Sequence, residues 1–191
     1  MDSQLTTAPT RQLTRTFVST RAVLAAVRPD QFGAQTPCAS WDVRALINHF
    51  IGTARWAAAT IGGNDVVARD HTVGDCLIAY DDSVRDAIAA FESPGTLEQT
   101  FTLPFGELSG PAFMGMIAGD LFTHGWDLAR AIGHHTDLDP ELADELLIQA
   151  KAGVTDAMRG PDGVSSFGPI VDAPADSSPA DRLAAFLGRS K

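Results

Sequence analysis

The sequence of 191 residues has little lysine, little cysteine and no long hydrophobic run. Lysine occurs only at Lys151 and Lys191, and the formal net charge at neutral pH is −10. A chain this acidic, with no cluster of basic residues, is a poor binder of phosphate backbones and of anionic lipid surfaces. We therefore expect neither nucleic acid nor a membrane among its partners.

Further absences bear on where the protein is found. No stretch reaches the roughly 18 consecutive apolar residues that a membrane-spanning helix needs. The first residues, Met1–Gln4, lack the basic and apolar segments of a secretion signal. The two cysteines, Cys38 and Cys76, are too few to suggest a disulfide framework, so we expect reduced thiols. Together these features predict a cytoplasmic protein.

Apolar residues are abundant enough for one hydrophobic core. They make up 45% of the chain and charged residues 20%, a balance typical of globular proteins and not of disordered chains. The length suits a single domain with a tail. We predict a helical domain over residues 1–160 and a C-terminal tail over residues 161–191, with a short helix that packs on the domain.

Helical spacing of apolar residues runs through most of the chain. It predicts a helix that ends at Pro29 and further helices over residues 41–62, 74–91, 111–133 and 140–158, with a last one from residue 179. Ser40 is the expected N-cap of the second helix. Residues 99–103 are expected to be extended, but no strands alternate with the helices, which excludes a parallel α/β sheet. The predicted fold class is all-α, a helical bundle.

The helix expected over residues 111–133 carries ionisable residues on its apolar face. Asp120 and His124 are four residues apart, so they lie on one face, about 6 Å apart along the axis. A buried carboxylate without a partner costs several kcal/mol. A divalent cation would compensate, because the pair offers an oxygen and a nitrogen ligand from one side of the helix.

The second predicted helix carries His49 beside its apolar stripe. If the two helices face each other, His49, Asp120 and His124 meet inside the bundle. Three such ligands leave a fourth position open, as in catalytic zinc sites, and bundle cores are known to hold metals. The alternative is that the histidines are hydrogen-bonded core residues and that Asp120 and His124 form a salt bridge. Spacing alone leaves both interpretations open.

Neighbouring residues allow two interpretations each. Asp127, one turn beyond His124, could orient a ligating imidazole through its other nitrogen, or it could face solvent. Cys38 precedes a helix N-terminus, which lowers a thiol pKa, or it is a small buried apolar residue. Gly115 and Gly119 would allow a close helix approach beneath Asp120, or they serve tight packing alone.

Two segments resemble a known family. Residues 36–49 match the pattern T-P-C-x-x-W-x-V-x-x-L-x-x-H, the signature of the DinB/YfiT-like superfamily. The match is closest to its actinobacterial branch, which is related to the N-terminal domain of mycothiol-dependent maleylpyruvate isomerase. Residues 120–129 are similar to the second motif of that branch. The resemblance implies a DinB-like four-helix bundle and a divalent metal, zinc or alternatively nickel, held by His49, Asp120 and His124.

The sequence departs from this family in two ways. The family commonly has His or Glu where this chain has Asp120. The isomerase also has an additional C-terminal domain, and the tail here is too short to be one. The resemblance therefore does not support maleylpyruvate isomerisation.

The function that the resemblance implies is a metal-dependent thiol S-transferase. Mycothiol would bind the open coordination position and attack an electrophilic substrate. One alternative is a metal-dependent hydrolase of an amide or ester, for which Asp127 is the only candidate base. Another is a non-catalytic metal-binding stress protein. The expected partners are a small-molecule thiol, an electrophile and a second copy of the chain in a homodimer.

Overall fold

The computed structural model describes residues 10–38, 40–67, 69–161 and 164–190. The segment Met1–Gln4, on which the expected absence of a secretion signal rests, lies outside the described residues. So does the start of the domain predicted over residues 1–160.

Six α-helices make up most of the described chain, which confirms the all-α fold class. They are α1 (Arg11–Leu24), α2 (Val43–Gly62), α3 (Cys76–Glu92), α4 (Gly110–Ile132), α5 (Pro140–Gly153) and α6 (Pro179–Phe186). Two short 3-10 turns also occur, η1 (Pro29–Gln31) and η2 (Asp156–Met158). The segment expected to be extended forms β1 (Thr100–Leu103), which pairs antiparallel with β2 (Gly106–Ser109) in a hairpin.

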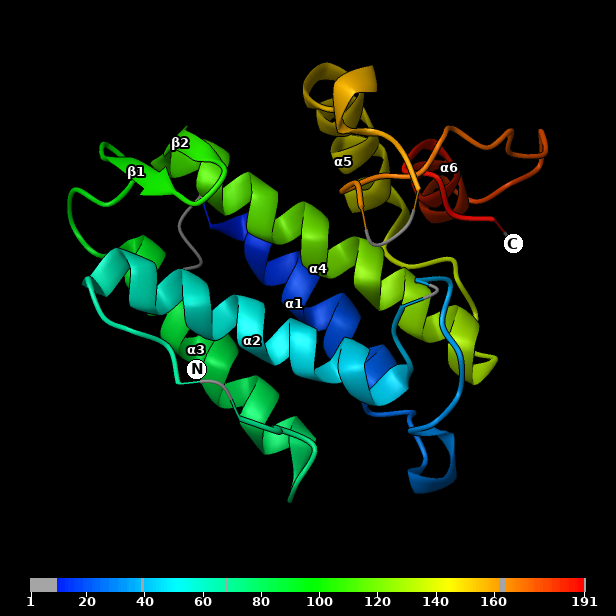
Figure 1. Cartoon of the computed structure of the whole chain (residues 1–191), viewed down its shortest axis with the longest axis horizontal. Helices are drawn as coiled ribbons and strands as arrows, with labels where there is room; N and C mark the ends of the chain where they lie inside the picture. The colour runs from blue at the N-terminus through cyan, green and yellow to red at the C-terminus, as the bar shows by residue number, and fades with distance from the viewer. Residues whose placement is uncertain (1–9, 39, 68, 162–163, 191) are drawn as a thin grey trace, which may run out of the picture.

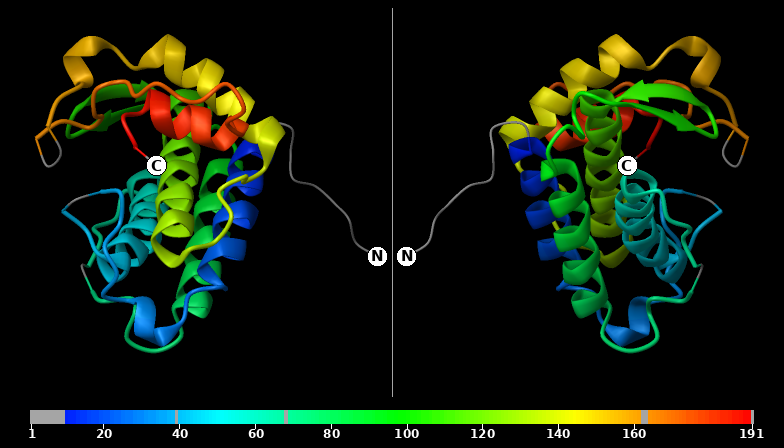
Figure 2. Two further views of the ribbon diagram at one scale, coloured as in Figure 1. Left: turned by 90° about the vertical axis from the view of Figure 1, so that its right-hand side faces the viewer. Right: turned by 90° about the vertical axis from the view of Figure 1, so that its left-hand side faces the viewer.

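Helices α1 to α4 form a bundle around one apolar core. Helices α1 and α2 each pack against both α3 and α4, and the hairpin lies at the end of the bundle where α4 begins (Figure 1). The largest buried side chains come from all four helices and include Phe17, Phe50, Tyr80, Phe113 and Trp126. Helices α5 and α6 pack on each other and cross one side of the bundle (Figure 2). None of the helices in the described ranges is long and apolar enough to cross a membrane.

Several helix ends differ from the prediction for local reasons. The N-cap of α2 is Asp42 and not Ser40, because the Asp42 carboxylate accepts a hydrogen bond from the backbone N–H of Ala45. Helix α1 ends at Leu24, and beyond it the N–H groups of Ala26 and Val27 bond to carbonyls only three residues back. Helix α5 ends at Gly153 rather than residue 158, since Val154 is already extended.

Helix α4 makes a close contact with α1 at Gly125. A Cβ atom built at Gly125 would lie 2.8 Å from Thr20 Oγ1 and 3.5 Å from Thr20 Cα. At Gly115 and Gly119 a Cβ would meet nothing within 4 Å. Both interpretations of these two glycines, close approach and tight packing, are therefore wrong. Helix α4 is buried on all sides over residues 121–129, and this places its polar side chains in contact with the surrounding elements.

Candidate metal centre

Helices α2 and α4 bring the three predicted ligand residues together. His49 Nε2 lies 2.9 Å from Asp120 Oδ2, and His124 Nε2 lies 3.5 Å from Asp120 Oδ1. The two imidazole rings are 4.7 Å apart between centroids. One ligand atom from each residue lies within 4.8 Å of the others. The arrangement is able to hold a metal ion; that it does so remains a prediction.

This cluster is partly open to solvent and is not enclosed in the bundle interior. The side chains of His49 and Asp120 are 27% and 31% exposed, whereas that of His124 is 9% exposed. The expectation that Asp120 lies in the core is therefore wrong, because α4 turns this position toward the edge of its contact with α2. The indole of Trp41 packs against both imidazoles, and its ring centroid lies 4.5 Å from that of His49 and 5.2 Å from that of His124. The centre thus combines solvent access with an aromatic wall.

The ionisable side chains at the centre strongly influence one another's pKa values. Burial opposes ionisation of Asp120, but the neighbouring His124 and His49 outweigh it and hold the pKa of this carboxyl well below its ordinary value. Burial also opposes protonation of His124. The contacts with Asp120, Asp127 and Cys38 outweigh that effect and raise the pKa of His124 well above 6.5. A proton on His124 therefore balances the carboxylates, and a bound cation would take over that role.

Asp127 is fully buried and contacts the other side of the His124 ring. Its Oδ2 atom lies 2.9 Å from His124 Nδ1, so the alternative that Asp127 faces solvent is wrong. Burial opposes its charge, yet the hydrogen bond from His124 and the nearby Arg189 hold the pKa of Asp127 below its ordinary value. An ionised carboxylate only accepts hydrogen bonds, so Nδ1 carries the hydrogen. The Nε2 atom is then left facing Asp120 and His49.

A second group of ligand types shares His124. Cys38 donates a hydrogen bond to Asp127 Oδ2 at 3.2 Å, and its Sγ lies 3.8 Å from His124 Nδ1. Cys38, His124 and Asp127 therefore also bring three ligand atoms close enough together to hold a metal ion. However, Arg189 places its guanidinium 3.6 Å from Asp127 Oδ2 and 3.9 Å from Cys38 Sγ. That positive charge disfavours a cation there, so the His49, Asp120 and His124 group is the better candidate.

Two of these residues were not predicted as part of the site. Cys38 had a signal in the sequence, since it belongs to the T-P-C motif, and the structure places it half-buried beside His124. No spacing pattern places Arg189 beside Asp127, because Arg189 lies in the tail, 151 positions from Cys38. His71 is buried, with its Nδ1 accepting a hydrogen bond from Arg69, and Trp126 belongs to the core.

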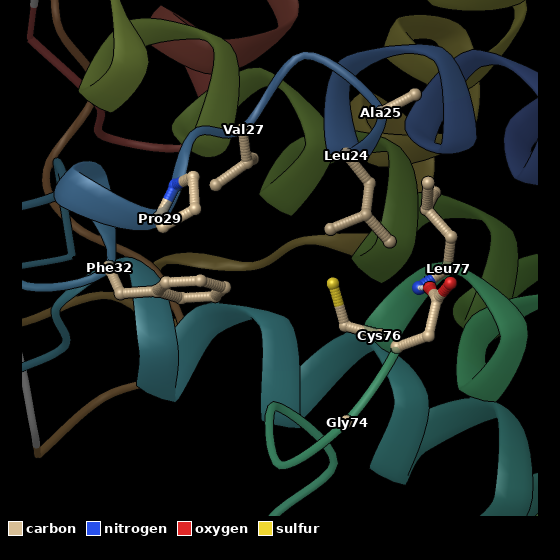
Figure 3. Close-up of a pocket in the computed structure, with 9 residues that line it drawn as sticks. Leu24, Ala25, Val27, Pro29, Phe32, Gly74, Cys76 and Leu77 are labelled. Carbon is tan, nitrogen blue, oxygen red and sulfur yellow. Dashed lines mark hydrogen bonds between the residues drawn. The ribbon is translucent and has the colours of Figure 1, made fainter.

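The molecule has a separate hollow that these residues do not line. It measures about 380 Å³ and lies between the end of α1, the η1 turn and the start of α3 (Figure 3). Its walls are mainly apolar, formed by Leu24, Val27, Phe32 and Leu77, with the Cys76 sulfur facing the space. Burial raises the pKa of the Cys76 thiol. This hollow offers no converging set of polar groups, so the candidate site is the cluster between α2 and α4.

Comparison with known proteins finds a family and relatives to which this chain is similar. A family model described as the mycothiol maleylpyruvate isomerase N-terminal domain matches residues 13–129, which include every residue of both groups but not Arg189. An uncharacterized protein of Mycobacterium tuberculosis, found in strains CDC 1551 / Oshkosh and H37Rv, is 43% identical over 173 residues. The match covers 88% of this chain and 91% of that protein. No solved structure gives a significant match.

Proposed function

Because this chain belongs to the mycothiol maleylpyruvate isomerase N-terminal domain family, we propose that it is a metal-dependent thiol S-transferase. The metal would be a divalent cation, zinc or alternatively nickel, held by His49, Asp120 and His124. The observation that carries the proposal is the convergence of these three ligand atoms within 4.8 Å at a partly exposed surface.

The residues present fit such a cation. Two imidazoles and a carboxylate are ordinary zinc ligands, and three protein ligands leave one position for an exogenous group. Histidines that bind metals almost always donate their other ring N–H to a carboxylate or carbonyl. Asp127 accepts that hydrogen bond from His124 at 2.9 Å. The partial exposure of His49 and Asp120 provides a route for a small ligand.

The chemistry follows from the groups around the centre. A bound divalent cation would stabilise the thiolate form of a coordinated thiol at neutral pH. Asp127 orients His124, and the Trp41 indole shields both imidazoles from water on one side. The thiol proton would pass to solvent, and the sulfur would form a bond to the electrophilic atom of a small substrate while that atom's bond to its leaving group breaks and the leaving group departs with the bonding electrons. Mycothiol is the thiol we propose, and the cytoplasm, where thiols stay reduced, is the proposed location.

The position of Asp127 argues against a hydrolase. Hydrolysis by metal-bound water needs a base close to that water. Asp127 was the only candidate, and it is fully buried behind the His124 ring, on the Nδ1 side. It cannot reach a group bound on the Nε2 side. A thiol needs no such base, because the cation itself favours its deprotonation.

Cobalt(II) substitution tests the proposal, because cobalt accepts the same ligand types and reports on them by absorption. We expect no sulfur-to-cobalt charge-transfer band in the protein alone, since Cys38 is not among the proposed ligands. Adding mycothiol should produce an intense near-ultraviolet band, accompanied by proton release. A spectrum unchanged by saturating mycothiol but perturbed by a hydroxamate would favour the hydrolase. Stoichiometric metal without response to either would favour a non-catalytic protein.

A further inference from the structure

We propose that Arg189 is a positioning residue of the metal centre, which acts on His124 through Asp127. It would hold the Asp127 carboxylate in place against His124 Nδ1, so that the His124 ring keeps its Nε2 atom toward Asp120 and His49. The inference rests on the proposed function for the identity of the metal ligands. Arg189 lies outside the residues that the family model matches.

The first step concerns the charged and polar groups that surround the buried Asp127 carboxylate. Its side chain is fully buried, and three groups converge on one oxygen, Oδ2. These groups are His124 Nδ1 at 2.9 Å, Cys38 Sγ at 3.2 Å and the Arg189 guanidinium at 3.6 Å. The other oxygen, Oδ1, has no hydrogen-bond partner among the described residues. Arg189 supplies the permanent positive charge that a buried carboxylate requires.

The second step is how Arg189 reaches the centre. Helix α6 is anchored to α4 because Asp181 Oδ1 accepts hydrogen bonds from Trp126 Nε1 at 2.9 Å and Thr136 Oγ1 at 2.8 Å. Beyond the helix end, Gly188 has a φ of 89°, and the Arg189 N–H donates to the Ala184 carbonyl at 2.9 Å. The chain therefore turns back toward α4.

Gly188 is required at this turn for two reasons. Its positive φ disfavours any other residue. A Cβ built there would also overlap the backbone of Gly168, so the two chain segments touch directly. The result is an arginine side chain only 13% exposed, whose position is set by packing and not by solvent.

The third step is the consequence for metal placement. The guanidinium lies against the Cys38, His124 and Asp127 group, where a cation would otherwise compete. It repels a metal from that side of the ring and keeps Asp127 available as the hydrogen-bond acceptor of Nδ1. Arg189 thus favours binding at the Nε2 side, with His49 and Asp120.

The test measures zinc affinity of the full chain by competition with a chromophoric chelator. We expect Arg189→Gln to weaken binding about 10- to 100-fold, the range typical when a partner behind a metal ligand is lost. The matched control is Arg182→Gln, which removes a guanidinium from α6 that contacts Asp144 and the Ser177 carbonyl instead. It should leave affinity unchanged. Arg189→Lys should recover part of the loss, because it keeps the charge.

A double-mutant cycle tests the route through Asp127. Arg189→Gln should add little to the loss caused by Asp127→Asn, since the two changes break one connection. Equal losses in Arg189→Gln and Arg182→Gln, or fully additive losses in the cycle, would overturn the inference.

A metal-free measurement separates this inference from the proposed function. If the wild-type chain binds no zinc, the proposed function fails, and NMR of the His124 ring tests Arg189 alone. The Nδ1–H signal should persist in wild type and in Arg182→Gln but exchange rapidly in Arg189→Gln. Persistence of that signal in Arg189→Gln would show that Asp127 holds the ring without the arginine.

Discussion

At the scale of single residues, His124 connects the two halves of the centre because both of its ring nitrogens are engaged. Nδ1 meets Asp127, and Nε2 faces Asp120 at 3.5 Å. One imidazole therefore couples a buried carboxylate to a half-exposed one. A change at Asp127, on the Nδ1 side, should therefore alter the metal affinity of the group on the Nε2 side.

The three ligands can be tested one at a time. Each of the changes His49→Ala, Asp120→Ala and His124→Ala should remove most of the bound metal, because the remaining two donors hold a cation much less firmly. His135→Ala, at an exposed position away from the centre, is the control and should keep full occupancy. Elemental analysis of protein purified without chelators measures the result. Full occupancy in His49→Ala would exclude this site.

The charge on His124 predicts a pH dependence of metal binding. Its pKa is raised above 6.5, so at neutral pH the metal-free ring holds a proton. A metal must displace that proton, so apparent affinity should rise with pH until the pKa of His124 is passed. Calorimetry in buffers of different ionisation enthalpy measures the protons released. Zinc affinity that stays constant between about pH 6 and pH 9 would contradict this protonation state.

At the scale of elements, α4 determines the site because it is in contact with neighbours all the way round. It packs on α1 through Gly125, on α2 beside the predicted ligands and on α6 through Trp126. A change that displaces α4 from α1 therefore also alters the register of Asp120 and His124 against His49.

Two glycine substitutions in α4 should have opposite effects on stability. Gly125→Ala should lower the free energy of unfolding by about 1–3 kcal/mol, the usual cost of overpacking, since its Cβ meets Thr20. Gly115→Ala, where a Cβ meets nothing within 4 Å, should instead raise it by up to about 1 kcal/mol. Urea unfolding midpoints at constant slope give both values. Equal effects of the two changes would contradict the close contact of α1 and α4.

At the scale of the whole molecule, the C-terminal elements are joined to the bundle at the metal centre. Helix α6 is held by Trp126 and Thr136, and the residue that follows it contacts Asp127. A metal at His49, Asp120 and His124 would link α2 to α4, and the tail is linked to α4 from the other side. Metal binding and global stability should therefore be coupled.

Chelation should lower the melting temperature of the full chain, and added zinc should restore it. Binding to the native state alone stabilises it by about 4 kcal/mol when the ligand is present at a thousandfold excess over Kd. Differential scanning calorimetry on protein shown to contain metal measures the shift. No change on metal removal would mean that the proton on His124 balances Asp120 and Asp127 as well as a cation does.

The sequence by itself determined the helices and the helix faces that carry the three predicted ligand residues. Apolar spacing of 3.6 residues identifies the buried face of a helix, and Val43, Leu46, Ile47 and Phe50 are all buried in α2. The same spacing showed that Asp120 and His124 share a face and that His49 lies beside the stripe of α2. Local chemistry also determined the glycine ends of α2 and α4.

Only the tertiary structure decided how deeply each polar group is buried and what stands behind it. Helical spacing reports which residues share a face, but not how many neighbours surround a helix. It therefore could not show that Asp127 is enclosed while Asp120 is 31% exposed. Nor could it bring Arg189 to Asp127, because that contact depends on how α6 packs on α4 and on the turn at Gly188. A charge pair between distant segments depends on topology, which no local pattern encodes.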